Sequence, residues 1–139
     1  MQQFLITSTF DKSFLFPILM ILIVDDSTTN QVLLEAILQE EGYVTITAFG
    51  AKEAFRVIDK NKPELILLDL LMPEMSGFEF LKQIKAKSST ADIPVVVVSA
   101  VGSKENMDLA KMLGAVEFFS KPINISALVN TVKRMVAIS

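Results

Sequence analysis

Five short apolar segments, evenly spaced and separated by helical patterns, narrow the folds available to this chain more than any other feature. The segments are residues 18–24, 44–48, 65–68, 95–98 and 116–119. Three of them are continuous rather than alternating in polarity, which is typical of strands covered on both faces. Residues 44–48 alternate apolar side chains with threonine, which fits an edge strand with one wetter face.

Helical spacing fills the intervals between these segments. Apolar residues recur at helical positions in residues 32–37, 51–58 and 125–132. Helix starts are predicted at Ser76 with Glu79, more weakly at Gly50 with Glu53, and at Asn124. Gly42 and Gly114 stand where helices should stop. Residues 103–113 form the least amphipathic of the expected helices.

A strand followed by a helix, five times over, predicts parallel strands joined by right-handed crossovers, with helices on both faces. We therefore expect an α/β fold, a doubly wound sheet of five parallel strands, as one domain over residues 18–139. Residues 1–17 form an N-terminal extension outside this pattern. The stretch MILIVDD, from Met20, would itself be a natural opening, so the extension is either not native to the domain or an added arm or strand.

Composition removes several classes of function. The net charge of −3 argues against a nucleic-acid surface, and the absence of cysteine and histidine excludes disulfides, zinc sites built on them and Ser-His-Asp catalysis. The longest apolar run, residues 14–24, contains Pro17 and is shorter than the roughly 18 residues of a membrane span. No signal peptide is recognisable. We expect a cytoplasmic protein that binds neither nucleic acid nor membrane.

Polar side chains follow four of the five predicted strands, at the edge where an open α/β sheet gathers its functional groups. They are Asp25, Asp26, Asp69, Ser99 and Lys121. Asp69 interrupts the apolar run LILLDLLMP, where an unpaired charge would cost several kcal/mol. If the first, third, fourth and fifth strands are neighbours, all five side chains converge on one pocket.

Each of these residues also has a purely structural explanation. The two acids before Ser27 suit a helix N-terminus, and Asp69 suits a turn before Pro73. A strand-end serine is common, and a lysine before proline is often a solvated loop residue. The combination favours a site, because the types are complementary. Three close carboxylates repel one another and need a cation. Oxygen ligands without histidine or cysteine favour Mg²⁺, and a lysine beside a hydroxyl suits a phosphoryl group attacked by an aspartate.

The order and spacing of four motifs resemble those of the receiver domain of two-component response regulators, the group that includes CheY. The motifs are ILIVDDS, LILLDLLMPEMSG, VVVVSA and FFSKPI. The resemblance covers residues 18 to about 137. It implies the flavodoxin-like (βα)5 fold with strand order 2-1-3-4-5. It also implies a signalling module that catalyses only its own phosphotransfer and dephosphorylation, with a sensor histidine kinase or histidine phosphotransfer protein as donor and a downstream protein as target.

The resemblance also implies residue roles. Asp69 would be the phosphoacceptor. Asp26 and Asp69 would bind Mg²⁺ directly together with the main-chain carbonyl of Leu71, and Asp25 would act mainly through water. Lys121 would pair with Asp69 and then with the phosphoryl group.

The signal would then pass along a short chain of residues. Ser99 would bind a phosphoryl oxygen and draw its loop inward, and Phe118, in place of the more frequent tyrosine, would follow it. The output surface would be the fourth helix, fifth strand and fifth helix, about residues 103–137. Leu71 and Val101 flank the pocket with apolar side chains that cannot orient a hydrolytic water, which predicts a long-lived phosphoaspartate.

Two other functions fit part of the pattern. A Mg²⁺-dependent phosphohydrolase with an aspartyl nucleophile generally has a second acid two residues later, where this chain has Leu71. A flavin-binding protein of the same architecture would bind phosphate at the loop DDSTTN, whose two acids repel it. The sequence leaves open the partner kinase, dimerisation through the last two helices, and whether the domain is free-standing or part of a longer protein.

Overall fold

A five-stranded parallel sheet forms the centre of the molecule. The computed structural model describes residues 18–136, so the expectation for the extension 1–17 lies outside the described residues. The strands are β2 (Met20–Val24), β3 (Val44–Ala48), β4 (Leu65–Leu68), β5 (Val95–Ser99) and β6 (Glu117–Ser120). Their order is β3-β2-β4-β5-β6. This confirms the predicted order 2-1-3-4-5 and the edge position of residues 44–48.

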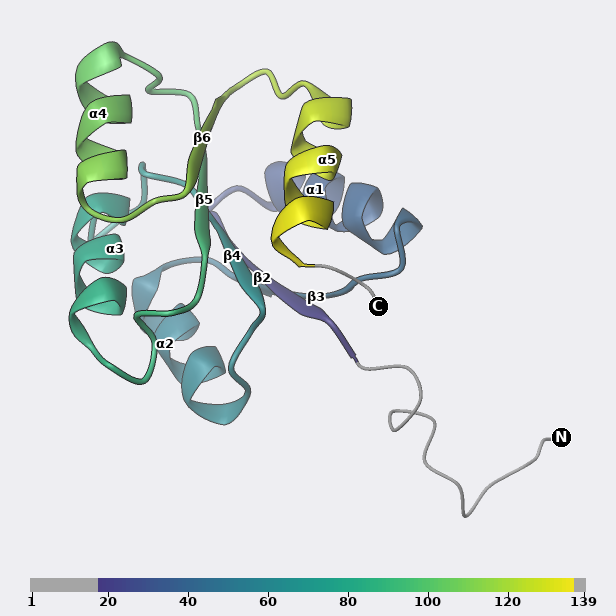
Figure 1. Cartoon of the computed structure of the whole chain (residues 1–139), viewed down its shortest axis with the longest axis horizontal. Helices are drawn as coiled ribbons and strands as arrows, with labels where there is room; N and C mark the ends of the chain where they lie inside the picture. The colour runs from purple at the N-terminus through teal and green to yellow at the C-terminus, as the bar shows by residue number, and fades with distance from the viewer. Residues whose placement is uncertain (1–17, 137–139) are drawn as a thin grey trace, which may run out of the picture.

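In the part of the chain that the structure describes, five helices cover the two faces of the sheet. They are α1 (Thr28–Glu40), α2 (Ala51–Lys60), α3 (Gly77–Ala86), α4 (Lys104–Met112) and α5 (Ile125–Met135). Figure 1 shows α2, α3 and α4 on one side of the sheet and α1 and α5 on the other. Over residues 18–136, no helix has the length and apolar character needed to cross a membrane.

The side chains of each strand alternate between two cores. Leu22, Ile66 and Val97 pack with α2, α3 and α4, whereas Ile23, Leu67 and Val96 pack with α1 and α5. All six are at most 1% exposed. This two-sided burial is why the central segments read as continuous apolar runs instead of alternating ones.

Local capping signals were reliable guides to the helix ends. The hydroxyl of Ser76 accepts from the Glu79 N–H at 3.2 Å, and the side chain of Asn124 caps α5 in the same way. Gly42 and Gly114 take φ of 92° and 111°, a backbone region that favours glycine. The predicted start at Gly50 is only partly capped. Gly50 makes no side-chain cap hydrogen bond, but Glu53 accepts from the N–H of Phe49 at 2.7 Å.

The bounds of three strands differ from the prediction. β5 ends one residue later than expected, at Ser99. β2 begins at Met20 rather than at Ile18, which is 62% exposed. The last strand runs from Glu117 to Ser120 instead of over 116–119. Because β6 is an edge strand, it can pair through its backbone while exposing polar side chains, so an apolar run does not mark its limits. The weakly amphipathic helix predicted at 103–113 does form, with Ser103 as its N-cap and Ala110 as its buried residue.

Candidate functional site

The ends of β2 and β4 place two of the predicted acids side by side. These strands pair in parallel, with Val24 opposite Leu68, and the N–H of Asp69 donates to the Val24 carbonyl at 2.9 Å. Asp25 and Asp69 are therefore the residues that directly follow two adjacent strands. On the other side, the N–H of Lys121 donates to the Ser99 carbonyl at 3.0 Å. Sheet order thus brings together residues up to 96 positions apart.

Three carboxylates form a compact acidic cluster. Asp25, Asp26 and Asp69 each offer an oxygen atom, and these atoms all lie within 4.8 Å of one another. Asp25 is 1% exposed and Asp69 is 7% exposed, whereas Asp26 is exposed. An oxygen-only donor set with one solvent-facing member fits a hard divalent ion that keeps part of its water shell, as Mg²⁺ does.

Lys121 supplies the positive charge of the cluster. Its Nζ lies 3.2 Å from Asp25 Oδ2 and 3.7 Å from Asp69 Oδ2, and its side chain is 18% exposed. It is therefore not a solvated loop lysine. One ammonium among three carboxylates leaves a formal charge of −2, which a divalent cation would neutralise.

Asp25 also has a local structural role. Its Oδ1 accepts from the N–H of Ser27 at 2.8 Å, and Ser27 is the N-cap of α1. The two oxygens face different partners, so the structural role of Asp25 uses Oδ1 and leaves Oδ2 beside Lys121 at the cluster.

Burial raises the pKa of Asp69 above its ordinary value, and the nearby Asp25 raises it further. Three contacts oppose these effects: the Leu71 N–H, which donates to Asp69 Oδ1 at 3.2 Å, the Lys121 ammonium and the Ser99 hydroxyl. The net direction is upward, so the carboxylate of Asp69 is harder to ionise than a solvated one. A cation at the cluster would favour the ionised form that a nucleophile needs.

Ser99 and Phe118 lie inward of the acids. Ser99 is fully buried, and its Oγ accepts from the Val101 N–H at 3.4 Å. Phe118 is 7% exposed and packs in the core beneath α2, α3 and α4. Gly102, in the loop after β5, lies so close to Ser120 that a side chain at position 102 would collide with the Ser120 hydroxyl. The loop after β5 and strand β6 are thus in direct contact.

Sequence reasoning missed two residues that contact the main chain next to the acids. Gly77 donates its N–H to the Leu70 carbonyl at 3.0 Å, and a Cβ there would lie 2.5 Å from the Asp69 carbonyl oxygen. Gln31 is 4% exposed, and its side-chain amide donates to the main-chain carbonyls of Asp25 and Ala48. Gln31 stands three positions before the buried Leu34 and seven before the buried Leu38, so it falls on the apolar stripe of the helix. A polar residue on that stripe is the signal by which the sequence could have revealed it.

An open groove of about 780 Å³ lies at the same edge of the sheet. It is lined mainly by the start of α2 and the loop after β4, with Phe49, Phe55 and Met75 among its walls. No member of the acidic cluster lines it. The groove therefore does not enclose a small substrate over Asp69, as a phosphohydrolase site would require.

Comparison with known proteins agrees with this geometry. The family model described as the response regulator receiver domain matches residues 21–133. The chain is 36% identical over 114 residues to sporulation initiation phosphotransferase F of Bacillus subtilis, covering 82% of this chain and 90% of that one. It is 34% identical to the phosphate regulon transcriptional regulatory protein PhoB of Pseudomonas aeruginosa, covering 81% of this chain and 49% of that one. The solved structure of the Vibrio cholerae chemotaxis protein CheY4 superimposes with a TM-score of 0.79 at 31% identity, covering 86% and 99% of the two chains.

Proposed function

Because this chain belongs to the family of response regulator receiver domains, we propose that it is switched by phosphorylation of Asp69. Receiver domains are signalling modules of two-component systems, and they interact with histidine kinases and downstream effectors. One observation carries the proposal: Asp69 lies buried beside two further carboxylates and within 3.7 Å of the Lys121 ammonium.

The proposed reaction is transfer of a phosphoryl group from a phosphohistidine on the donor protein. A carboxylate oxygen of Asp69 attacks phosphorus, a P–O bond forms and the P–N bond breaks. The bonding electron pair leaves with the imidazole, which takes up a proton from solvent. Lys121 neutralises charge on the phosphoryl oxygens, and the buried hydroxyl of Ser99 donates a hydrogen bond to one of them.

We propose Mg²⁺ as the cofactor. Asp26 and Asp69 would hold it directly with the main-chain carbonyl of Leu71, and Asp25 would act through water. When bound, the ion supplies positive charge to the phosphoryl oxygens. The acidic cluster supports this assignment, since three carboxylate oxygens lie within 4.8 Å of one another.

The switch follows from the added charge. A phosphoryl group brings about −1.5 to −2 charge and three acceptor oxygens. Ser99, drawn toward these oxygens, is paired with Ser120 of β6, so its movement reaches β6 and the neighbouring Phe118. Such a contact biases a two-state element in favour of the phosphorylated conformation.

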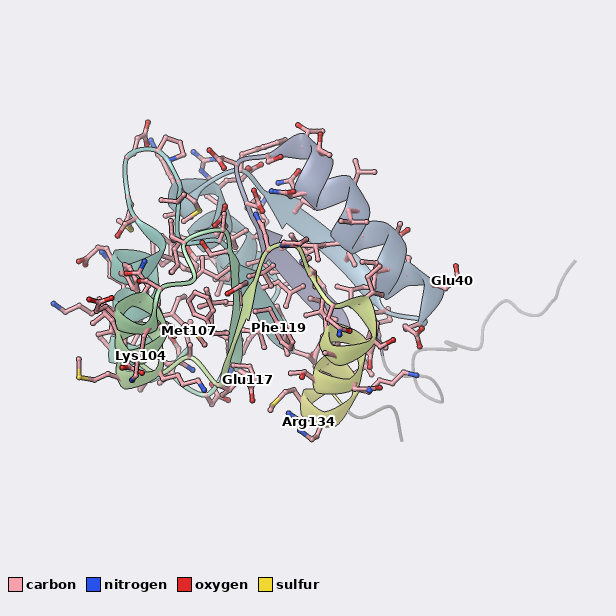
Figure 2. The ribbon with its side chains drawn as sticks, turned by 90° about the horizontal axis from the view of Figure 1, so that it is seen from above. Glu40, Lys104, Met107, Glu117, Phe119 and Arg134 are labelled. Atoms are coloured by element: carbon pink, nitrogen blue, oxygen red, sulfur yellow. The ribbon has the colours of Figure 1, made fainter. Side chains whose placement is uncertain are left out.

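The output surface that we propose is formed by α4, β6 and α5, within residues 103–137. Figure 2 shows five of its side chains from above: Lys104 and Met107 on α4, Glu117 and Phe119 on β6, and Arg134 on α5. A surface that mixes apolar residues with both charges suits a protein partner, either a downstream target or a second copy of the chain.

Intact-mass measurement after incubation with Mg²⁺ and acetyl phosphate tests the proposal. We expect a gain of one phosphoryl group that is lost in Asp69→Asn. The matched control is Asp92→Asn, which removes an exposed carboxylate paired with Lys62 away from the cluster and should leave the gain unchanged. No gain in the unaltered protein, or an undiminished gain in Asp69→Asn, would overturn the assignment.

A further inference from the structure

The side chain of Gln31 is buried beneath the acidic cluster. It is 4% exposed, although it belongs to α1, a helix on the surface of the molecule. Its Nε2 donates two hydrogen bonds, at 2.8 Å to the carbonyl of Asp25 and at 3.1 Å to the carbonyl of Ala48. A buried amide is costly unless it is hydrogen-bonded, so these two bonds hold it in a defined place.

The two bonds continue the sheet past its last paired residues. Val24 and Ala48 are the last pair of β2 and β3, and the N–H of Asp25 still donates to the Ala48 carbonyl at 3.0 Å. One residue later the chain turns toward α1, and within residues 18–136 no main-chain N–H donates to the Asp25 carbonyl. Gln31 supplies that donor from the first turns of the helix. The side chain thereby joins the ends of two strands to α1.

The Asp25 carbonyl belongs to the peptide unit that leads into Asp26. The Asp25 carboxylate is already held by Ser27 and Lys121. The Asp26 side chain is exposed, and within residues 18–136 it forms no hydrogen bond or ion pair. The main chain therefore sets the direction of its Cα–Cβ bond, and with it the region that the carboxylate can reach. The bond from Gln31 fixes the orientation of that peptide unit, and with it the direction in which the Asp26 carboxylate leaves the backbone.

We propose that Gln31 is a positioning residue for cation binding, which holds the Asp25–Asp26 peptide so that the Asp26 carboxylate faces Asp69. The purpose of the cation rests on the proposed function, but the effect of Gln31 on cation affinity does not require phosphorylation. Groups that orient metal ligands typically change metal affinity by about 10-fold to 100-fold when they are removed.

Calorimetric titration with Mg²⁺ alone tests this inference. We expect Gln31→Met, which keeps the length of the side chain but removes its donors, to bind Mg²⁺ about 10-fold more weakly. The matched control is Gln39→Met on the same helix. Gln39 donates to the Thr45 hydroxyl at 2.9 Å on the exposed side, far along α1 from the acids, and its replacement should leave the affinity unchanged. Thermal unfolding of each variant in EDTA checks that it is folded.

A second measurement separates positioning from general damage. In phosphorylation by acetyl phosphate, Gln31→Met should need about 10-fold more Mg²⁺ for half-maximal rate, while the rate at saturating Mg²⁺ stays close to that of the unaltered protein. If Gln31→Met does not fold, Gln31→Asn replaces it, because its amide is one methylene too short to reach both carbonyls.

Four results would overturn the inference: no Mg²⁺ binding by the unaltered protein, an unchanged affinity in the Gln31 variant, an equal loss in Gln39→Met, or a fall in rate that saturating Mg²⁺ does not restore. If Mg²⁺ binding depends on Gln31 but the protein gains no phosphoryl group from acetyl phosphate, the proposed function is refuted and this inference stands.

Discussion

The contact between α3 and the end of β4 leads to a quantitative prediction for Gly77→Ala. A Cβ at position 77 would lie 2.5 Å from the Asp69 carbonyl oxygen and 2.6 Å from the Leu70 Cα. Both atoms are main chain and cannot rotate away. Relief requires moving the start of α3, but Phe80 and Leu81 in its first turns are completely buried. The collision therefore acts on the backbone that carries Asp69.

The free energy of unfolding should fall by about 2–3 kcal/mol. Overpacking a tight site costs about 1–3 kcal/mol. Displacing the Gly77 N–H from the Leu70 carbonyl, now at 3.0 Å, costs about 0.5–1.5 kcal/mol more. Replacing glycine lowers the entropy of the unfolded chain and returns about 0.4–1 kcal/mol. For a domain of this size the net loss corresponds to a fall in Tm of roughly 10 °C.

Urea denaturation of Gly77→Ala and Gly50→Ala measures the difference. Gly50 also stands at a helix start, but its φ of −171° is extended backbone and a Cβ there meets nothing within 4 Å. Gly50→Ala should lose less than about 1 kcal/mol, through the weaker N-cap alone. Equal losses in the two variants, or a loss below about 1 kcal/mol in Gly77→Ala, would show that the contact with Asp69 is not tight.

Three further predictions concern the acids and their neighbours. Asp69→Asn should raise the urea midpoint of the metal-free protein at pH 7, because burial raises the pKa of Asp69 and its ionised form therefore lowers the stability of the folded state. This gain in stability should shrink as the pH falls through the raised pKa, and a gain that grows in acid would contradict the expected sign. Lys121→Ala removes both ion pairs of the cluster and should lower the free energy of unfolding by about 1.5–3 kcal/mol without Mg²⁺, a loss that saturating Mg²⁺ should reduce. Leu71→Asn should accelerate loss of the phosphoryl group, because an amide in place of a 54% exposed apolar side chain can orient water. Intact mass measured over time gives the rate, and a rate equal to that of Leu71→Val would refute the prediction.

Local features of the sequence were enough to predict the architecture. Continuous apolar runs marked β4 and β5 because both faces of these strands are covered. Ser76 and Asn124 marked helix starts, since a cap acts on an N–H only a few residues away. The residue types that follow four of the strands also pointed to a candidate site, because parallel strands end at a common edge. Boundaries failed at β6, where an edge strand tolerates polar side chains.

Only the tertiary structure decided which groups touch. Lys121 lies closer to Asp25, 96 residues away in the chain, than to Asp69, and no pattern within one element contains that preference. The tight approach of Gly77 to the Asp69 carbonyl and the reach of Gln31 to two strand ends likewise depend on how α3 and α1 pack. Periodicity and capping act over a few residues, whereas these contacts are set to within an ångström by several elements at once. The sequence by itself therefore determined the elements, their partners in the sheet and the types of residue at their ends, and packing determined the geometry that this chemistry needs.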